Sequence, residues 1–415
     1  MTGPTKDLAL QKNILQIMDA TPITDIHTHL YAPAFGDLLL WGVDELLNHH
    51  YLIAEALRWG KISPQEFYSM GRRAQADFIW QTLFLDHSPV SASALGFLET
   101  MQAFGLDISS RNLDAWRAHF EGLNLDEHID NLFKIVGLDS VVMTNDPLDP
   151  AELPTWESGF KADSRFHAAL RLDSLILNWE SSCLKLQEWG YNVELNLTGR
   201  TFEEVRRFLS DWIDKSQALY AAISLPPDFR YPDESVTLEF LEECVVPVAR
   251  EKDIPVGLMI GVRRQVNPAL QLAGDSVGLA NVASVEAICA RYPDNRFLVT
   301  MLARENQYEL CVAARKFPNL MIFGCWWFLN IPYIIDEITC MRVELLGTSV
   351  IPHHSDVRIL EQVVPKWLHA KHITAHILAE KYTSLRLMGW NPTDSEIQRD
   401  ISDLFGGNFW RFLGR

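Results

Sequence analysis

The chain has 415 residues, of which 48% are hydrophobic, and its formal net charge is −18 at pH 7. This length suits one large or two ordinary domains, and the apolar fraction is enough for a sizeable core. Because contact with phosphate needs clustered lysine and arginine, a chain this acidic is not expected to bind nucleic acid. A small anionic substrate stays open, since a few local arginines can overcome a distant field that salt screens.

The cysteines and the apolar runs indicate the compartment. The six cysteines form no C-x-x-C motif and no regular spacing, and the N-terminus shows no signal-peptide pattern. We therefore interpret them as reduced thiols in a cytoplasmic protein. The most apolar run, 320–335, contains Gly324, Asn330 and Pro332 and is too short to span a bilayer. We expect no membrane partner, and the sequence leaves a homo-oligomer open.

The first chemical signal lies near the N-terminus. Residues 7–20 are expected to form an amphipathic helix, and Ile23 to Ile26 to end a short buried strand, followed by His27 and His29. Side chains two residues apart in a strand point to the same face, so both imidazoles project side by side. Neutral imidazole is the commonest metal ligand, and this pair can chelate one divalent ion. The alternative is two polar residues that end a strand.

Residues 31–137 show helical patterns, at 43–59, 64–85 and 126–135, and no convincing strand. More than a hundred residues of helix between two strands exceeds what a crossover needs. We predict a helical insertion over residues 31–137. It follows an N-terminal helix and first strand (1–30) and precedes the remainder of the main domain (138–415).

Short apolar runs alternate with helical stretches after the insertion, which is typical of parallel strands buried on both faces. With the first strand they make eight, which predicts an α/β fold, a (β/α)8 TIM barrel with a helical insertion after the first strand. A doubly wound open sheet competes, but its G-x-G-x-x-G turn is absent. Helices at 358–382 and about 395–404 would close the barrel. The seven later strands are predicted at 140–144, 166–172, 219–225, 254–261, 296–301, 319–324 and 349–353.

Chemistry in such barrels lies at the carboxyl ends of the strands. This places His27 and His29 near Asp356, which follows the eighth strand. Three protein ligands with an open position suit Zn²⁺. Read alone, Asp356 could instead be the N-cap of a helix over 357–366.

A strand-one H-x-H with a strand-eight aspartate resembles the ligand pattern of the amidohydrolase superfamily. Its two-metal hydrolases add a bridging lysine after strand four and histidines after strands five and six. This chain has no such lysine, and it has Met259 and Thr300 at the other two places. The resemblance therefore implies one divalent metal ion, held by His27, His29 and Asp356.

The resemblance sharpens to one family, the uronate isomerases (glucuronate isomerase). The chain is similar to the divergent, Bacillus-type branch, which also carries methionine where classical members have a fifth-strand histidine. The segments that carry the likeness stand in the family's order and spacing: Thr24 to Leu30, His50-Tyr51, Arg171 to Asp173, Gly324 to Phe328 and Ser355 to Arg358.

This resemblance implies a small-molecule hexuronate substrate, with D-glucuronate converted to D-fructuronate and D-galacturonate to D-tagaturonate. Such a reaction needs a base for the C2 proton, an electrophile for the enediolate oxygen, and an acid at C1. The metal is an electrophile, and Asp356, or a water it orients, is the candidate base. By resemblance, Tyr51 could shuttle protons, and His50 could open the sugar ring or bind hydroxyls. Without the resemblance, residues 49–51 indicate an ordinary helix segment.

Substrate-binding candidates stand at other strand ends. The planar fork of arginine grips carboxylates bidentately, which favours Arg171 and Arg358 as ligands of the carboxylate and hydroxyls. Trp326 and Trp327 belong either to the core or to an apolar wall against the sugar ring. The pair 263–264 also consists of arginines, but charges beyond a strand are usually solvated.

Two other classes of function stay open. A mononuclear metal-dependent hydrolase or lactonase fits the same scaffold, because superfamily membership does not fix the reaction. Incomplete two-metal ligation and arginines suited to a sugar acid count against it. A sugar-acid binding protein without catalysis would not need His27, His29, Asp356 and Tyr51 together. The sequence does not indicate which uronate epimer is preferred.

Overall fold

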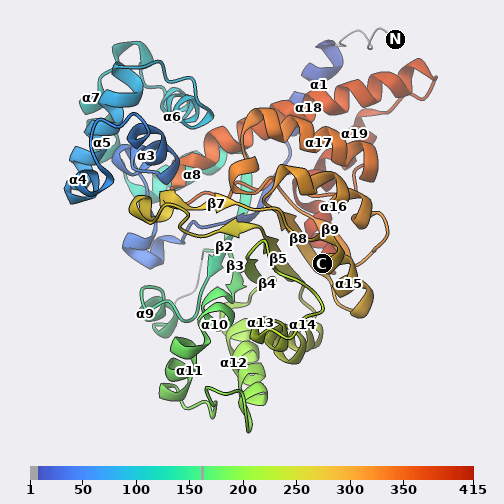
Figure 1. The fold of residues 1–415 in the computed structure, drawn as a ribbon. Coiled ribbons are helices and arrows are strands. Elements are labelled where there is room, and N and C mark those ends of the chain that lie inside the picture. The colour runs from blue at the N-terminus through green and yellow to red at the C-terminus, as the bar shows by residue number, and fades with distance from the viewer. Residues whose placement is uncertain (1–7, 160–162) are drawn as a thin grey trace.

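The computed structural model describes residues 8–159 and 163–415, so residues 1–7 of the predicted N-terminal segment lie outside it. Seven parallel strands form one sheet in the order β1-β2-β3-β4-β5-β8-β9, which curls around the barrel axis (Figure 1). This confirms the α/β barrel and the first seven predicted strands. The strands are β1 (Ile23–Thr28), β2 (Leu138–Asn145), β3 (Phe166–Arg171), β4 (Ala221–Leu225), β5 (Val256–Ile260), β8 (Phe297–Met301) and β9 (Leu320–Ile322).

The prediction of a regular eighth strand at 349–353 was wrong. Only Ile351 pairs with the sheet, through a single parallel bridge to Phe323. The next residue, Pro352, has no backbone N–H and cannot donate to the strand on the other side of the segment, β1. The eighth position of the barrel is therefore filled by an irregular segment.

This segment turns back onto the first strand. The backbone N–H of His29 donates to the carbonyl oxygen of Val357 (2.8 Å), and that of Asp356 donates to His27 (3.2 Å). Asp356 has a φ of 56°, in the left-handed region that non-glycine residues seldom occupy. The two bonds hold the irregular segment beside the histidine pair.

Helices surround the sheet and cover both ends of the apolar strands, whose residues are buried throughout in β1, β5 and β8. The helices that pack around the outside of the barrel are α9 (Leu153–Glu157), α10 (Asp173–Leu177), α11 (Trp179–Glu188), α12 (Thr201–Ser216), α13 (Val236–Phe240), α14 (Val246–Glu251), α15 (Val282–Arg291), α16 (Gln307–Ala314), α17 (Pro332–Leu346) and α19 (Asp394–Ser402). The last helix, α20 (Asn408–Phe412), instead packs Phe409 against a second cluster of strand residues that includes Ile26 and Ala222.

Residues 31–137, all described by the structure, are helical apart from turns and one bridge between Leu40 and Ile359. Residues 43–120 form a hydrophobic core separate from that of the barrel and group on one side of the molecule (Figure 1). Residues 32–39 and 129–136 pack into the barrel's own core instead. The predicted helix 43–59 is broken at Asn48, and 64–85 at Met70. The helices are α2 (Val43–Leu47), α3 (His50–Leu57), α4 (Pro64–Ser69), α5 (Arg72–Trp80), α6 (Ala92–Ala103), α7 (Leu113–Glu121) and α8 (Leu125–Val136).

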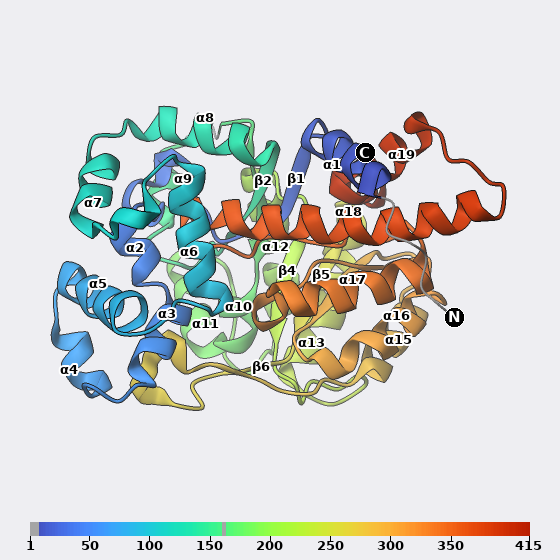
Figure 2. The ribbon, with the colours of Figure 1, turned by 90° about the horizontal axis from the view of Figure 1, so that it is seen from above.

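The long helix α18 (Val363–Leu387) connects the two parts. It contacts α1 (Leu8–Asp19) and α17 on the barrel, and α6 and α8 in the insertion (Figure 2). It begins at Val363 and not near Arg358 as predicted, because the chain first passes through the bridge at Ile359. Among the described residues, no helix has the length and apolar character that crossing a bilayer would require.

Candidate metal centre and active site

A cavity lies at the carboxyl ends of the barrel strands, with about 550 Å³ of space that protein atoms do not fill, open solvent included. It brings together all nine residues that the sequence nominated, and their roles stay predictions. Five residues that it did not nominate also line the cavity. The fourteen lining residues are His27, His29, His50, Tyr51, Thr144, Arg171, Ala222, Ser224, Met259, Arg264, Trp326, Trp327, Asp356 and Arg358.

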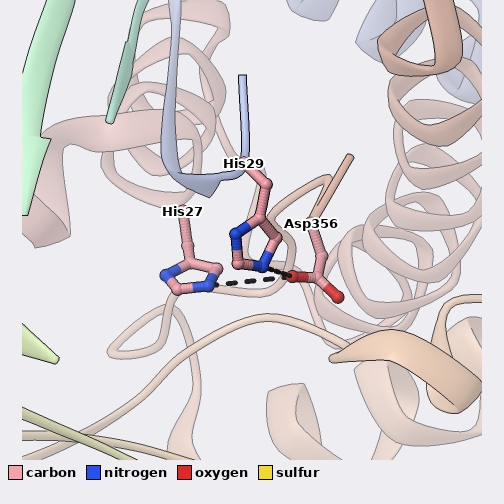
Figure 3. Close-up of side chains that lie close together, drawn as sticks. All are labelled: His27, His29 and Asp356. Carbon is pink, nitrogen blue, oxygen red and sulfur yellow. Dashed lines mark ion pairs between the residues drawn. The ribbon is translucent and has the colours of Figure 1, made fainter. Parts of the chain in front are cut away.

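His27, His29 and Asp356 form a group that can hold a metal ion, with one potential ligand atom from each within 4.8 Å of the others. The Nε2 atoms of His27 and His29 lie 3.7 Å and 3.5 Å from Oδ1 of Asp356. Figure 3 shows both imidazoles directed at this oxygen, while the second carboxylate oxygen points away. The same-face projection expected for the H-x-H pair is therefore confirmed.

A tyrosine from the barrel fixes the tautomer of His27. Nδ1 of His27 lies 2.9 Å from the hydroxyl oxygen of Tyr220. This hydroxyl donates its own proton to the backbone carbonyl of Ile26 (2.9 Å). The phenol oxygen must therefore accept a proton from Nδ1. The proton of the neutral imidazole is thus assigned to Nδ1, which leaves the Nε2 lone pair for a metal.

A threonine does the same for His29. Thr144 donates its hydroxyl proton to the carbonyl of Thr28 (2.9 Å), and its oxygen lies 2.8 Å from Nδ1 of His29. Nδ1 is again the protonated nitrogen, and Nε2 faces Asp356 with a free lone pair. Neither Tyr220 nor Thr144 was nominated from the sequence.

The group fits a divalent metal ion. Nε2 of His27 and Oδ1 of Asp356 are buried and lack a hydrogen-bond partner, which is costly unless another ligand binds there. Burial lowers the pKa of His27 to about 3 and that of His29 well below its usual value, so both stay neutral. Burial raises the pKa of Asp356, although His27 and Arg358 oppose the rise.

We expect Tyr220→Phe and Thr144→Val to weaken metal binding about 10–100-fold, the usual effect of removing a partner of a ligating histidine. Competition with a chelating dye measures the affinity. Thr28→Val is the matched control. Thr28 lies on β1 between the two histidines, and its buried hydroxyl donates to the carbonyl of Val142 and not to an imidazole. Equal affinities of all variants would contradict the tautomer assignment.

Two buried side chains hold the backbone before Asp356. The amide of Asn330 donates to the carbonyls of His354 (3.1 Å) and Ser355 (3.2 Å). The backbone N–H of Ser355 donates to Asp25 (3.0 Å), which precedes the histidine pair on β1. These bonds support the left-handed conformation of Asp356. Because the next α-helix, α18, begins only at Val363, the alternative of Asp356 as its N-cap was wrong.

The two nominated arginines differ in their surroundings. Arg171 donates through Nε (2.9 Å) and Nη2 (2.7 Å) to one oxygen of Asp173, whose other oxygen accepts from the backbone of Ser224. In the part of the chain that the structure describes, no carboxylate pairs with the guanidinium of Arg358. Burial lowers the pKa of Arg358. A half-buried guanidinium without an ion pair can bind a substrate carboxylate through two parallel hydrogen bonds.

The insertion and the loop after β9 form the remaining walls. Tyr51 and His50 begin α3, and the ring of His50 meets Trp327 edge-on at 5.8 Å. Trp326 and Trp327 are buried yet line the cavity, and the indole N–H of Trp327 has no partner. Burial raises the pKa of Tyr51 well above its usual value. The phenol therefore stays protonated at neutral pH.

Ligands for a second metal ion are not found among the described residues. Among the described residues, the group that can hold a metal ion consists of His27, His29 and Asp356. Met259 lines the cavity on β5, where two-metal hydrolases carry a histidine, and Ser224 lines it on β4. Thr300 on β8 is fully buried, outside the cavity lining. The single ion therefore stays a prediction.

The expectation that both arginines after β5 are solvated is confirmed, because Arg263 and Arg264 are both exposed. Arg264 also lines the cavity, whereas Arg263 lies outside the lining. The guanidinium carbon of Arg264 lies 5.9 Å from the ring centroid of Trp327. The cavity is thus lined by a third arginine.

Solved structures provide the comparison with known proteins. A uronate isomerase from Bacillus halodurans is 49% identical with a TM-score of 0.96, and the match covers 98% of this chain and 96% of that one. A uronate isomerase from Thermotoga maritima is 14% identical (TM-score 0.77; 99% and 98% covered). A glucuronate isomerase from Caulobacter crescentus is also 14% identical (TM-score 0.75; 99% and 95%). These last two show the fold alone.

No protein-family model and no curated protein matches the chain. The Bacillus halodurans enzyme matches it at nearly half of all positions and over almost the full length of both proteins. This confirms the resemblance that the sequence motifs indicated, including the Bacillus-type branch. The chain belongs to the uronate isomerase family.

Proposed function

We propose that the protein interconverts hexuronates, D-glucuronate with D-fructuronate and D-galacturonate with D-tagaturonate. The observation that carries the proposal is the 49% identity with a uronate isomerase over almost the whole chain. The cavity supports it, because guanidinium groups beside a candidate metal centre suit a sugar acid. A hydrolase with two metal ions would need ligands that the cavity lining lacks.

In this proposal, Asp356 takes the C2 proton with the carboxylate oxygen that points away from the imidazoles (Figure 3). Tyr51 moves protons between the C2 and C1 oxygens, for which a protonated phenol is suited. Arg358 binds the carboxylate or hydroxyls, and Arg171 does so together with Asp173. Trp326 and Trp327 exclude water from the sugar, and His50 helps to open the ring or binds hydroxyls.

We also propose that the metal is Zn²⁺, because two imidazoles and one carboxylate with an open position match its preference. Bound between His27, His29 and Asp356, it would supply a Lewis acid at neutral pH. A reducing compartment, the cytoplasm, suits the enzyme, since all six cysteines are free and five are buried.

A coupled assay with D-glucuronate and D-galacturonate, with and without a chelator, tests the function. We expect turnover of at least one hexuronate. Metal analysis of protein purified without chelator should find about one equivalent, which a His27→Ala, His29→Ala double variant loses. Two equivalents would contradict the single-ion centre, and absence of turnover of both hexuronates would contradict the function.

Arg358→Lys is expected to lower kcat/KM for hexuronates by about 10–100-fold, since it keeps the charge but loses the fork of charge-assisted hydrogen bonds. Arg171→Lys should cost less, because Asp173 already occupies the fork of Arg171. Arg230→Lys, outside the cavity lining, is the control. Unchanged kcat/KM in Arg358→Lys would remove this residue from substrate binding.

A further inference from the structure

The chain leaves β5 as an arm, residues 261–278, before it enters the next barrel helix. Two short strands, β6 (Val262–Arg263) and β7 (Ser276–Val277), pair antiparallel at the base of the arm. There the backbone N–H of Gly278 also donates to the carbonyl of Gly261 (2.9 Å). Figure 1 shows the arm in yellow, below α3.

The far end of the arm is attached to the insertion. It forms a 3₁₀ segment, Pro268–Gly274, that contacts α3 and α4. The hydroxyl of Tyr68 donates to the carbonyl of Leu270 (2.7 Å), and Leu270 and Ala273 pack against the hydrophobic core of the insertion. Because the barrel fixes one end of the arm and the insertion the other, residues along it hold defined positions at the cavity.

Arg264 is the residue of the arm that lines the cavity. Its Nη1 donates to Asp275 (2.7 Å), and its guanidinium lies over the ring of Trp327. The side chain of Asp275 is only 3% exposed, and it also accepts from the backbone N–H of Gln265 (2.7 Å). Asp275 thereby orients the guanidinium. This one hydrogen bond to the protein leaves most of the five N–H groups of Arg264 available to a ligand.

We propose that Arg264 is a substrate-binding residue that contacts hexuronate oxygens at the open end of the cavity, with Asp275 as its positioning residue. This rests on the proposed function. The side chain of Arg264 is 49% exposed, whereas that of His27 is 2% exposed. Arg264 therefore meets the substrate from the solvent side of the cavity. Carboxylate and hydroxyl oxygens are acceptors that a guanidinium binds in pairs.

Four variants test this assignment. Arg264→Met should raise KM for the hexuronate about 10–100-fold, with kcat within about threefold of wild type, because it removes binding outside the reacting carbons. Arg264→Lys should restore part of the affinity, and Asp275→Asn should raise KM less than Arg264→Met. Arg263→Met is the matched control, the neighbouring arginine on the same arm but outside the cavity lining. It should keep the wild-type KM.

Equal KM values for Arg264→Met and wild type, or an equal rise in Arg263→Met, would overturn the assignment. Calorimetric titration with D-glucuronate measures binding without turnover, so the two proposals fail separately. A wild-type protein that binds hexuronates but does not isomerise them contradicts the proposed function alone. Equal calorimetric affinities of wild type and Arg264→Met contradict the role of Arg264 alone. Thermal unfolding is the control for folding. If Arg264→Met and Arg263→Met unfold at the same midpoint temperature, loss of fold does not explain a difference in KM between them.

Discussion

Replacing Asp356 with asparagine is expected to lower kcat for hexuronate isomerisation by about 10²–10⁴-fold, the usual contribution of a general base. One carboxylate oxygen faces Nε2 of His27 and His29, and the other points away from both rings. Asparagine keeps an oxygen toward the imidazoles but offers no group that takes a proton from carbon. Steady-state kinetics with D-glucuronate, together with metal content, measures the effect.

Asp146→Asn is the matched control for this variant. Asp146 is a buried aspartate directly after β2, and it lies outside the cavity lining. Its carboxylate accepts a hydrogen bond from Ser174 and has no contact with the histidine pair. We expect the control to keep a near wild-type kcat. An Asp356→Asn enzyme with full metal content and unchanged kcat would show that another group takes the C2 proton.

The barrel could be predicted from the sequence because strands buried on both faces are continuously apolar. The eighth strand could not be predicted in this way. Its apolar run resembles the others, but only Ile351 pairs with the sheet, at Phe323 directly after β9, and Pro352 has no backbone N–H to donate to β1. The left-handed turn at Asp356 then brings the chain back to β1. No hydrophobic periodicity signals such a turn, because it is stabilised by distant partners such as Asn330.

The candidate metal ligands could be predicted because the spacing of two histidines in a strand fixes the direction of both side chains. The residues that orient them could not. Thr144 reaches His29 through the pairing of β2 with β1, whereas Tyr220, directly before β4, reaches His27 from a strand that does not pair with β1. In a sequence, each is one more polar residue in or beside a buried strand. A single chain gives no signal that separates such a partner from an ordinary core hydroxyl.

Arg264 illustrates the same limit on the surface of the barrel. Its position at the cavity depends on the arm folding against the insertion, through contacts such as that between Tyr68 and Leu270, 202 residues apart. The local sequence indicates only a charged pair beyond a strand. Which of the two arginines, Arg263 or Arg264, lines the cavity is therefore determined by tertiary structure.

Tyr51→Phe is expected to lower kcat by about 10²-fold, the lower end of the range for a group that transfers protons. Burial raises the pKa of Tyr51 well above its usual value, so the group acts as a protonated phenol and not as a base. Phenylalanine keeps the ring contacts with Phe328 and Lys366, which limits the change to the hydroxyl. Tyr31→Phe is the control, because the Tyr31 hydroxyl bonds to Glu152 outside the cavity lining.

Isomerisation in heavy water tests the proton transfer to which Tyr51 and Asp356 are assigned. A proton held by a base exchanges with solvent before it returns to carbon, whereas a hydride shift would keep the substrate's own hydrogen. We expect deuterium at C1 of the ketose product, detected by NMR. Tyr51→Phe should incorporate at least as much deuterium per turnover, because slower transfer between the oxygens gives the base more time to exchange. Complete retention of the C2 hydrogen over many turnovers, with a fully active Tyr51→Phe enzyme, would contradict this mechanism.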